Sequence, residues 1–145
     1  MSTVREDPVL GALVFDTRLN WYESTQETSG GERLKLMVSI DTPEDEELSI
    51  SNARALLPAL LAAIENGKEF ASEKLLKLKN ESWLEAGEAP LSTSQFISAL
   101  EIESIVVFSQ QLTEFYFKDG ELFWGHTVLL SWDPVRGFYD GNIAG

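Results

Sequence analysis

One helical stretch with a regular apolar stripe lies between two groups of strand-like runs, and this order constrains the fold most. Before it, residues 9–15 and 34–40 are short aliphatic runs joined by a polar connection over 25–31. Four further strand-like runs follow it, over 102–108, 112–117, 122–132 and 138–143. The stripe itself recurs at three- and four-residue spacing, at Ile50, Ala53, Leu57, Leu60, Leu61 and Ile64. The pattern predicts an α+β fold, an antiparallel β-sheet with helices packed against it, in a single domain over 1–145.

The helical stretch carries start and stop signals that predict more than one helix. Thr42 begins a Thr-Pro-Glu-Asp sequence typical of a helix start, with an acidic run over 44–47. Pro58 lies inside the apolar stripe, where the loss of a backbone hydrogen bond predicts a kink or a restart. Gly67 is a predicted stop, and a further helix is expected over 68–79, with anchors Phe70, Leu75 and Leu78.

The segment that follows contains the clearest local signal in the chain. Ser92 and Gln95 form a capping box, and Leu91 and Phe96 occupy the two positions of a hydrophobic staple. A short helix that ends near Leu100 is therefore expected.

The Asp-Gly pair at 119–120 is a favoured two-residue hairpin turn, and it predicts the register of the strands on either side. With this pair as the loop, Thr113 lies opposite His126. Gly125 sits in the middle of the second strand and predicts that something packs closely over it, in the favoured interpretation a helix of the same domain and in the alternative a ligand or partner residue. Side-chain alternation places one set on the core face: Phe115, Phe117, Leu122, Trp124, His126, Val128 and Leu130.

Charge and composition argue against several classes of function. The 24 acidic residues against 11 basic ones give a formal net charge of −13. Nucleic acid and anionic membranes are therefore poor partners, because binding to phosphates depends on Lys and Arg. The absence of cysteine removes disulfides and thiolate chemistry and is typical of a reducing compartment. No apolar leader or uninterrupted membrane-length run is present, so a cytoplasmic location is expected.

His126 is the only histidine, so one chain cannot form a two-histidine metal site, and neither a metal nor a cofactor is expected. The favoured interpretation is structural: the imidazole bonds a buried acceptor and fixes the sheet. The alternative is a small enzyme or ligand site centred on His126, formed with Thr113, Trp124 and Asp140.

The acidic surface and the tryptophans favour a partner-binding role. Exposed tryptophans are enriched at binding hot spots, and carboxylates steer a basic partner toward its site. The candidate partner-binding residues are Glu44, Asp45, Glu46, Glu47, Trp83, Glu101, Glu103, Glu114, Glu121 and Trp132. Replacing the acids over 44–47 is expected to slow association and to flatten its salt dependence.

Two C-terminal blocks carry a resemblance to a known family. The sequence Leu-Phe-Trp-Gly-His-Thr at 122–127, followed by Phe-Tyr-Asp-Gly-Asn-Ile-Ala-Gly at 138–145, resembles the bacterial family called domain of unknown function 2262. Weaker similarity extends upstream to the strand at 9–15. The resemblance implies a small cytoplasmic bacterial protein, and it carries no catalytic residue over to this chain.

These observations favour a non-enzymatic acidic binding protein. Its most concrete form is an immunity protein of a toxin–antitoxin type system, which binds a cognate bacterial toxin and occludes the active site. The analogy rests on size, charge and class. The expected partner is a protein with a basic domain, and the chain is expected to be a monomer or weak dimer. A module that associates with itself through the second face of the sheet is a further alternative.

Overall fold

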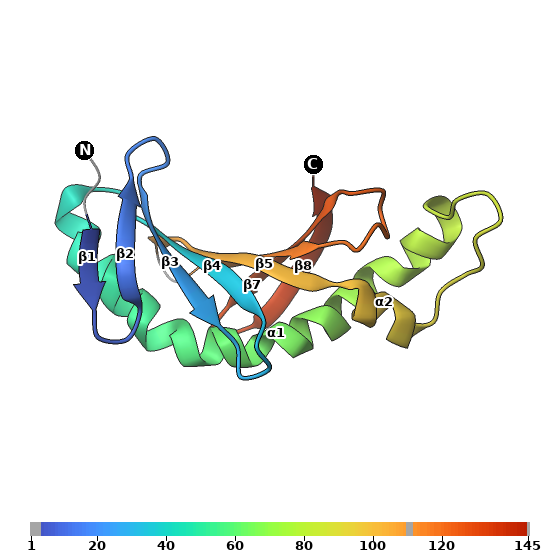
Figure 1. The fold of residues 1–145 in the computed structure, drawn as a ribbon, viewed down its shortest axis with the longest axis horizontal. Helices are drawn as coiled ribbons and strands as arrows, with labels where there is room; N and C mark the ends of the chain where they lie inside the picture. Colours follow the sequence, from blue (N-terminus) through green and yellow to red (C-terminus); the bar gives the residue numbers. More distant parts are fainter. Residues whose placement is uncertain (1–3, 110–111, 145) are drawn as a thin grey trace.

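The computed structural model describes residues 4–109 and 112–144, and within them eight strands form one sheet in chain order (Figure 1). Neighbouring strands are antiparallel except for β4 and β5. These two strands pair in parallel, and in the sequence they precede and follow the helical segment. This architecture confirms the predicted α+β class. The strands are β1 Val4–Asp7, β2 Gly11–Asp16, β3 Trp21–Glu27, β4 Arg33–Ser39, β5 Glu101–Val107, β6 Thr113–Lys118, β7 Thr127–Asp133 and β8 Gly137–Ala144.

Three helical elements connect β4 to β5. The 3₁₀ turn η1 (Pro43–Asp45) leads into α1 (Glu46–Ser82), which runs along one face of the sheet and continues beyond it toward α2 (Thr93–Ala99) (Figure 1). The capping box of α2 is present, with both the Ser92 and the Gln95 side chains bonded to backbone N–H groups. The short helix expected after Ser92 is confirmed.

The predicted division of the helical stretch is wrong, because α1 continues through both Pro58 and Gly67. Pro58 is exposed, while Leu57 and Leu60 on either side of it are buried in the core. Burial of such side chains compensates for the backbone hydrogen bond that proline removes. Leu75 is buried as expected, but Leu78 is 39% exposed and does not anchor the helix.

Gly67 is a packing residue where α1 crosses the sheet. A Cβ atom at this position would lie 2.9 Å from Phe138 Cζ and 3.3 Å from Phe117 Cζ. The missing side chain therefore lets the helix backbone approach the aromatic side chains of β6 and β8. At Gly141 in β8 a Cβ atom would lie 2.9 Å from Leu130 Cδ2 of the neighbouring strand β7 and 3.7 Å from Phe70 Cε1 of α1.

By length and composition, the segment Pro43–Ser82 is apolar enough to cross a membrane. This differs from the sequence expectation, which counted only uninterrupted apolar runs. In the structure the buried side chains of the helix form a stripe that joins the core of the sheet. Packing within the fold buries 39% of the most apolar part of this segment.

The predicted register of β6 and β7 is also wrong. Thr113 pairs with Trp132, six positions beyond His126, and Lys118 pairs with Thr127. Because the shift is even, side-chain alternation is preserved, and the members of the predicted core face that lie in these strands are buried: Phe115, Phe117, Val128 and Leu130. Leu122 is buried as well, although it lies between the two strands. Trp124 and His126 instead belong to a loop over 119–126.

The N-terminal half contains more strand than the sequence predicted. β3 extends through Glu27 into the expected polar connection, and β1 precedes the first predicted strand. Both strands are rich in polar residues, so their composition does not show the hydrophobic alternation of a half-buried strand.

Asp7 fastens β1 to α1. Its buried carboxylate accepts hydrogen bonds from Arg54 Nε at 3.0 Å and from the backbone N–H groups of Val9 and Leu10. The Arg54 guanidinium, helped by the two backbone bonds, holds the pKa of Asp7 well below its usual range. The ionised carboxylate is therefore favoured in the folded state.

Gly67→Leu should lower the free energy of unfolding by about 1–3 kcal/mol or more, because the new side chain must displace the rings of Phe117 and Phe138. The matched control is Ala62→Leu, on an exposed position of the same helix, which should change stability by less than about 0.5 kcal/mol. Urea unfolding followed by circular dichroism measures both. Equal effects of the two substitutions would contradict the packing role of Gly67.

Asp7→Asn should lower the unfolding free energy at pH 7 by about 1–3 kcal/mol, since hydrogen bonds to a charged group are lost. Because the folded-state pKa is depressed, the stabilisation is present above the unfolded pKa of about 4 and is lost progressively as the pH falls from there toward the lower folded-state pKa. Urea midpoints measured from pH 7 to pH 2 should fall more steeply for the wild type than for Asp7→Asn. The exposed Asp41→Asn variant should keep the wild-type slope.

Candidate functional site

The loop over 119–126 is built around one buried carboxylate. Asp119 accepts hydrogen bonds from the backbone N–H groups of Glu121 at 3.0 Å, Phe123 at 2.9 Å and Gly125 at 3.1 Å. Three successive turns are closed by backbone bonds from Leu122, Trp124 and His126 to residues earlier in the segment. The loop forms in place of the predicted tight hairpin, because the carboxylate accepts hydrogen bonds from backbone N–H groups that would otherwise bond to a neighbouring strand.

Left-handed backbone conformations shape the same loop. Gly120 has φ +55°, and a Cβ there would lie 2.3 Å from the carbonyl oxygen of Ala99 at the end of α2. Gly125 has φ +87° and lies in the open, with Glu121 Oε2 at 4.0 Å as the nearest neighbour of a Cβ. The expectation that another segment packs over Gly125 is wrong, because glycine is present there for its conformation.

Two bulky residues share this conformation. Glu121 has φ +68° and Trp124 has φ +59°. An L-amino acid with a large side chain is strained there, by about 1–3 kcal/mol. The surrounding bonds of Asp119 hold the chain in place.

An aromatic cluster lies at this end of the molecule. Trp83, which follows α1, packs its ring 4.7 Å from that of Trp124, 5.4 Å from that of His126 and 5.5 Å from that of Phe123. Phe123 is fully buried, whereas Trp124 is 52% exposed. We call Trp83, Trp124 and His126 the aromatic end.

The imidazole of His126 makes a hydrogen bond in which Nδ1 lies 2.6 Å from the carbonyl oxygen of Phe123. Since a carbonyl only accepts, Nδ1 carries a proton, and in the neutral ring Nε2 is the acceptor. The imidazole thus bonds the backbone as the structural interpretation expects. It is nevertheless half-buried and lies at the rim of a pocket, outside the core of the sheet.

The pocket beside His126 has a volume of about 330 Å³ and a predominantly acidic lining. Glu101 and Glu103 reach it from β5, and Glu121 reaches it from the loop. Lys118 supplies a positive charge to the lining. The arrangement suits hydrogen-bond donors and cationic groups of a partner better than anions. Among the described residues, no three His, Asp or Glu side chains are grouped to hold a metal ion.

The structure separates the residues of the alternative ligand site. Trp124 and His126 lie together, but Thr113 is buried at the opposite end of β6, and Asp140 pairs with Ser131 within β7 and β8. Four or five strand residues separate these positions, or about 15 Å. The proximity of Thr113 to His126 was a consequence of the incorrect register.

The predicted partner-binding acids fall into two distant groups. Glu101, Glu103 and Glu121 line the pocket near the aromatic end. Residues 44–47 lie at the start of α1, which spans 37 residues and therefore about 55 Å. Within that second group Glu44 is exposed, and Asp45 accepts a bond from Thr42, while Glu46 and Glu47 pair with Arg5.

Two further candidates lie outside both groups. Trp132 is 7% exposed and packs edge-on against Phe115, so the expectation that it is an exposed anchor is wrong. In the observed register Trp132 pairs with Thr113 inside the sheet. Glu114 accepts a hydrogen bond from the Tyr116 hydroxyl at 2.9 Å, and burial together with this bond raises the pKa of Tyr116 to about 12.

Comparison with known families gives one match. A family model described as "Uncharacterized protein conserved in bacteria (DUF2262)" matches residues 7–143. The chain belongs to this family. The match extends across the DUF2262 protein from β1 to β8, and includes both the aromatic end and the acidic pocket. No curated protein and no solved structure matches the chain.

Asp119→Ala should lower the unfolding free energy of the DUF2262 protein by about 2 kcal/mol or more, because three backbone N–H groups lose their acceptor. The near-ultraviolet circular dichroism of the tryptophans should weaken at the same time, as the loop that positions Trp124 loosens. Asp140→Ala is the control, since that exposed carboxylate bonds only its near neighbours Gly141 and Asn142. A wild-type spectrum for Asp119→Ala would contradict the role of Asp119.

Proposed function

We propose that this DUF2262 protein is a non-enzymatic binding protein that docks a basic protein partner on its aromatic end. Its most concrete form is an immunity protein that binds a cognate bacterial toxin in the cytoplasm and occludes the toxin's active site. The observation that carries the proposal is Trp124, which is 52% exposed although its backbone has φ +59°.

Trp124 is unfavourable for the isolated molecule in two respects. Its indole leaves apolar area in water, and its backbone conformation is strained by about 1–3 kcal/mol. Strained residues cluster at functional sites, and tryptophan is enriched among interface hot spots. Packing against Trp83 orders the ring before binding, which reduces the entropy lost on association.

The acidic lining beside Trp124 defines the chemistry of the partner. Glu101, Glu103 and Glu121 lie at the same end as the aromatic cluster, and the whole chain carries a net charge of −13. A body with this charge is steered toward basic surfaces and is repelled by acidic ones. Toxins that act on nucleic acids have such basic clefts, and an acidic surface with an aromatic anchor can cover one.

The geometry supports a binding role more strongly than an enzyme centred on His126. The Nδ1 position of His126 is engaged by Phe123, Thr113 lies at the far end of β6, and Asp140 lies in the middle of β8. The pocket is lined mainly by acids, with one imidazole, the Lys118 ammonium and the Thr127 hydroxyl, and neither of the two residues expected to support the imidazole reaches it.

Affinity capture from the source bacterium tests the proposal with Trp124→Gly as the principal variant. Loss of ring packing and relief of backbone strain oppose each other, so stability should stay within about 1 kcal/mol of the wild type. Retention of the partner should nevertheless fall at least about tenfold, as for a hot-spot residue. The retained protein should be basic, and its association rate, measured by surface plasmon resonance, should fall as salt rises.

The interface proposed at the aromatic end replaces the candidate over 44–47, so Glu44→Gln, near the opposite end of α1, is the matched surface control and should retain the partner as the wild type does. Co-expression adds a functional measurement: the wild-type chain should restore growth to cells that produce the retained protein, and Trp124→Gly should not. Equal retention by wild type and Trp124→Gly, or loss of retention only in Glu44→Gln, would remove the aromatic end as the interface.

A further inference from the structure

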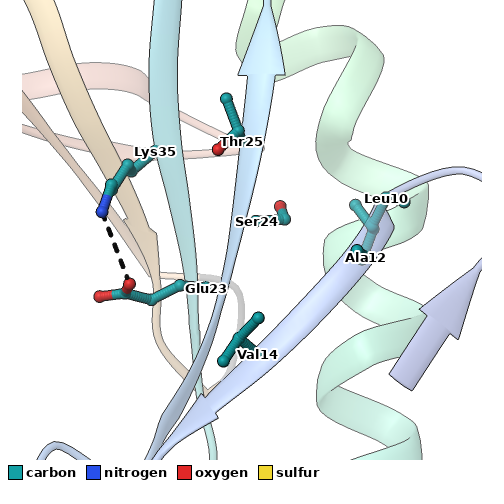
Figure 2. Close-up of a pocket in the computed structure, with 8 residues that line it drawn as sticks. Leu10, Ala12, Val14, Glu23, Ser24, Thr25 and Lys35 are labelled. Atoms are coloured by element: carbon teal, nitrogen blue, oxygen red, sulfur yellow. Dashed lines mark ion pairs between the residues drawn. The ribbon is translucent and has the colours of Figure 1, made fainter. Parts of the chain in front are cut away.

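A second cavity lies far from the aromatic end, where β2 and β3 separate. The two strands pair from Asp16↔Trp21 to Val14↔Glu23, and their pairing stops there. Figure 2 shows them diverging from Val14 toward Leu10 and Thr25. On their outer sides β2 remains paired with β1, and β3 remains paired with β4. We call this opening the wedge.

The wedge has a volume of about 430 Å³, within the range of about 300–1,000 Å³ that small-ligand pockets occupy. Ala12 and Val14 supply an exposed apolar wall from β2, and Ser24 lies between the two strands (Figure 2). Glu23 and Lys35 form an ion pair of 3.8 Å on the opposite side. Apolar and polar groups therefore converge on the same space.

Backbone groups of both strands face the wedge. In an antiparallel pair, the backbone groups of successive residues point alternately toward the two neighbouring strands. Because Thr28 N–H bonds to the Glu32 carbonyl, the backbone groups of Ser24 and Gln26 also point toward β4. The N–H and C=O groups of Thr25 consequently point toward β2. The same alternation, counted from the paired Val14, directs the N–H and C=O groups of Ala12 toward β3.

A side chain replaces the missing strand pairing at the wide end of the wedge. Gln26 donates from Nε2 to the carbonyl oxygen of Leu10 at 2.8 Å and to the Ser24 hydroxyl at 3.0 Å. This amide bridges β2 and β3 where their backbones no longer meet. The Gln26 side chain therefore links the separated strands at the wide end of the wedge. At the narrow end the two backbones pair at Val14 and Glu23.

We propose that the wedge binds a short extended peptide segment, which inserts between β2 and β3 and bonds to both. A peptide presents N–H and C=O groups in alternation, which complements the groups of Ala12 and Thr25 that face the space. An apolar side chain of the peptide packs on Val14, which is 43% exposed. The outer edges of β1 and β8 offer bonds on one side only, whereas the wedge offers them on two.

The test uses the full chain and one defined probe, the capped peptide acetyl-Val-Thr-Val-Thr-amide. Titration followed by ¹H–¹⁵N spectra should shift the backbone amides of Ala12 and Thr25 and the side-chain amide of Gln26, and the shifts should saturate with a Kd of about 1 mM or tighter. The same peptide carrying N-methyl groups on every backbone amide should bind at least about tenfold more weakly, because it cannot donate to the strands.

Ala12→Phe places a ring in the wedge and should weaken binding at least about tenfold, while Val135→Phe, at a 92% exposed turn position, should bind as the wild type does. If Ala12→Phe fails to fold by circular dichroism, the N-methylated peptide on the wild type still decides. Three results would each overturn the proposal: no saturable shift, equal binding of both peptides, or shifts confined to the edges at β1 or β8. Because none of these residues belongs to the aromatic end, failure here is distinct from failure of the proposed function.

Discussion

The packing of α1 on one face of the sheet is the interaction on which the rest of the structure depends. The helix connects β4 to β5, and such a crossover is what allows these two strands to pair in parallel. Its apolar stripe buries the inner face of the sheet, and Gly67 lets the helix backbone approach the sheet closely. Without this helix, the inner faces of β3 to β8 would have no apolar surface to pack against.

The same helix builds the aromatic end, because it continues past the sheet. Near its end Lys79 is almost fully buried and donates to the Trp83 carbonyl at 2.7 Å and to Glu88 at 3.0 Å. Asn80 makes two hydrogen bonds with the backbone of Leu91, at the start of the segment that leads into α2. These bonds return the chain toward β5 and fix Trp83 beside the loop over 119–126.

The sequence was most informative where a local pattern had one structural solution. The capping box at Ser92 fixes a helix start through bonds between neighbours, so reading it requires no tertiary information. The alternation of apolar residues identified the buried face of β6 and β7 even with the wrong register, since a shift by an even number keeps each side chain on its face.

Local patterns were misleading where a residue serves a distant contact. Gly67 has the sequence signature of a helix stop, but its role is set by Phe117 and Phe138, which lie far away in the chain. Asp119 and Gly120 match a tight turn, but the Asp119 carboxylate captures amides as far as Gly125. Trp124 therefore lies in an exposed loop and not in the core. Gly120 and Gly125, both within this loop, were the sequence signal that could have predicted it.

Both proposed surfaces occur where regular strand pairing is interrupted. In a continuous ladder each backbone group bonds a neighbour and each inner side chain is buried, so little remains for a ligand to contact. The loop over 119–126 replaces pairing with the bonds of Asp119 and leaves Trp124 exposed. The wedge replaces it with the side chain of Gln26 and leaves Ala12 and Thr25 facing open space. The stability supplied by α1 elsewhere in the core is what allows the fold to sustain two such interruptions.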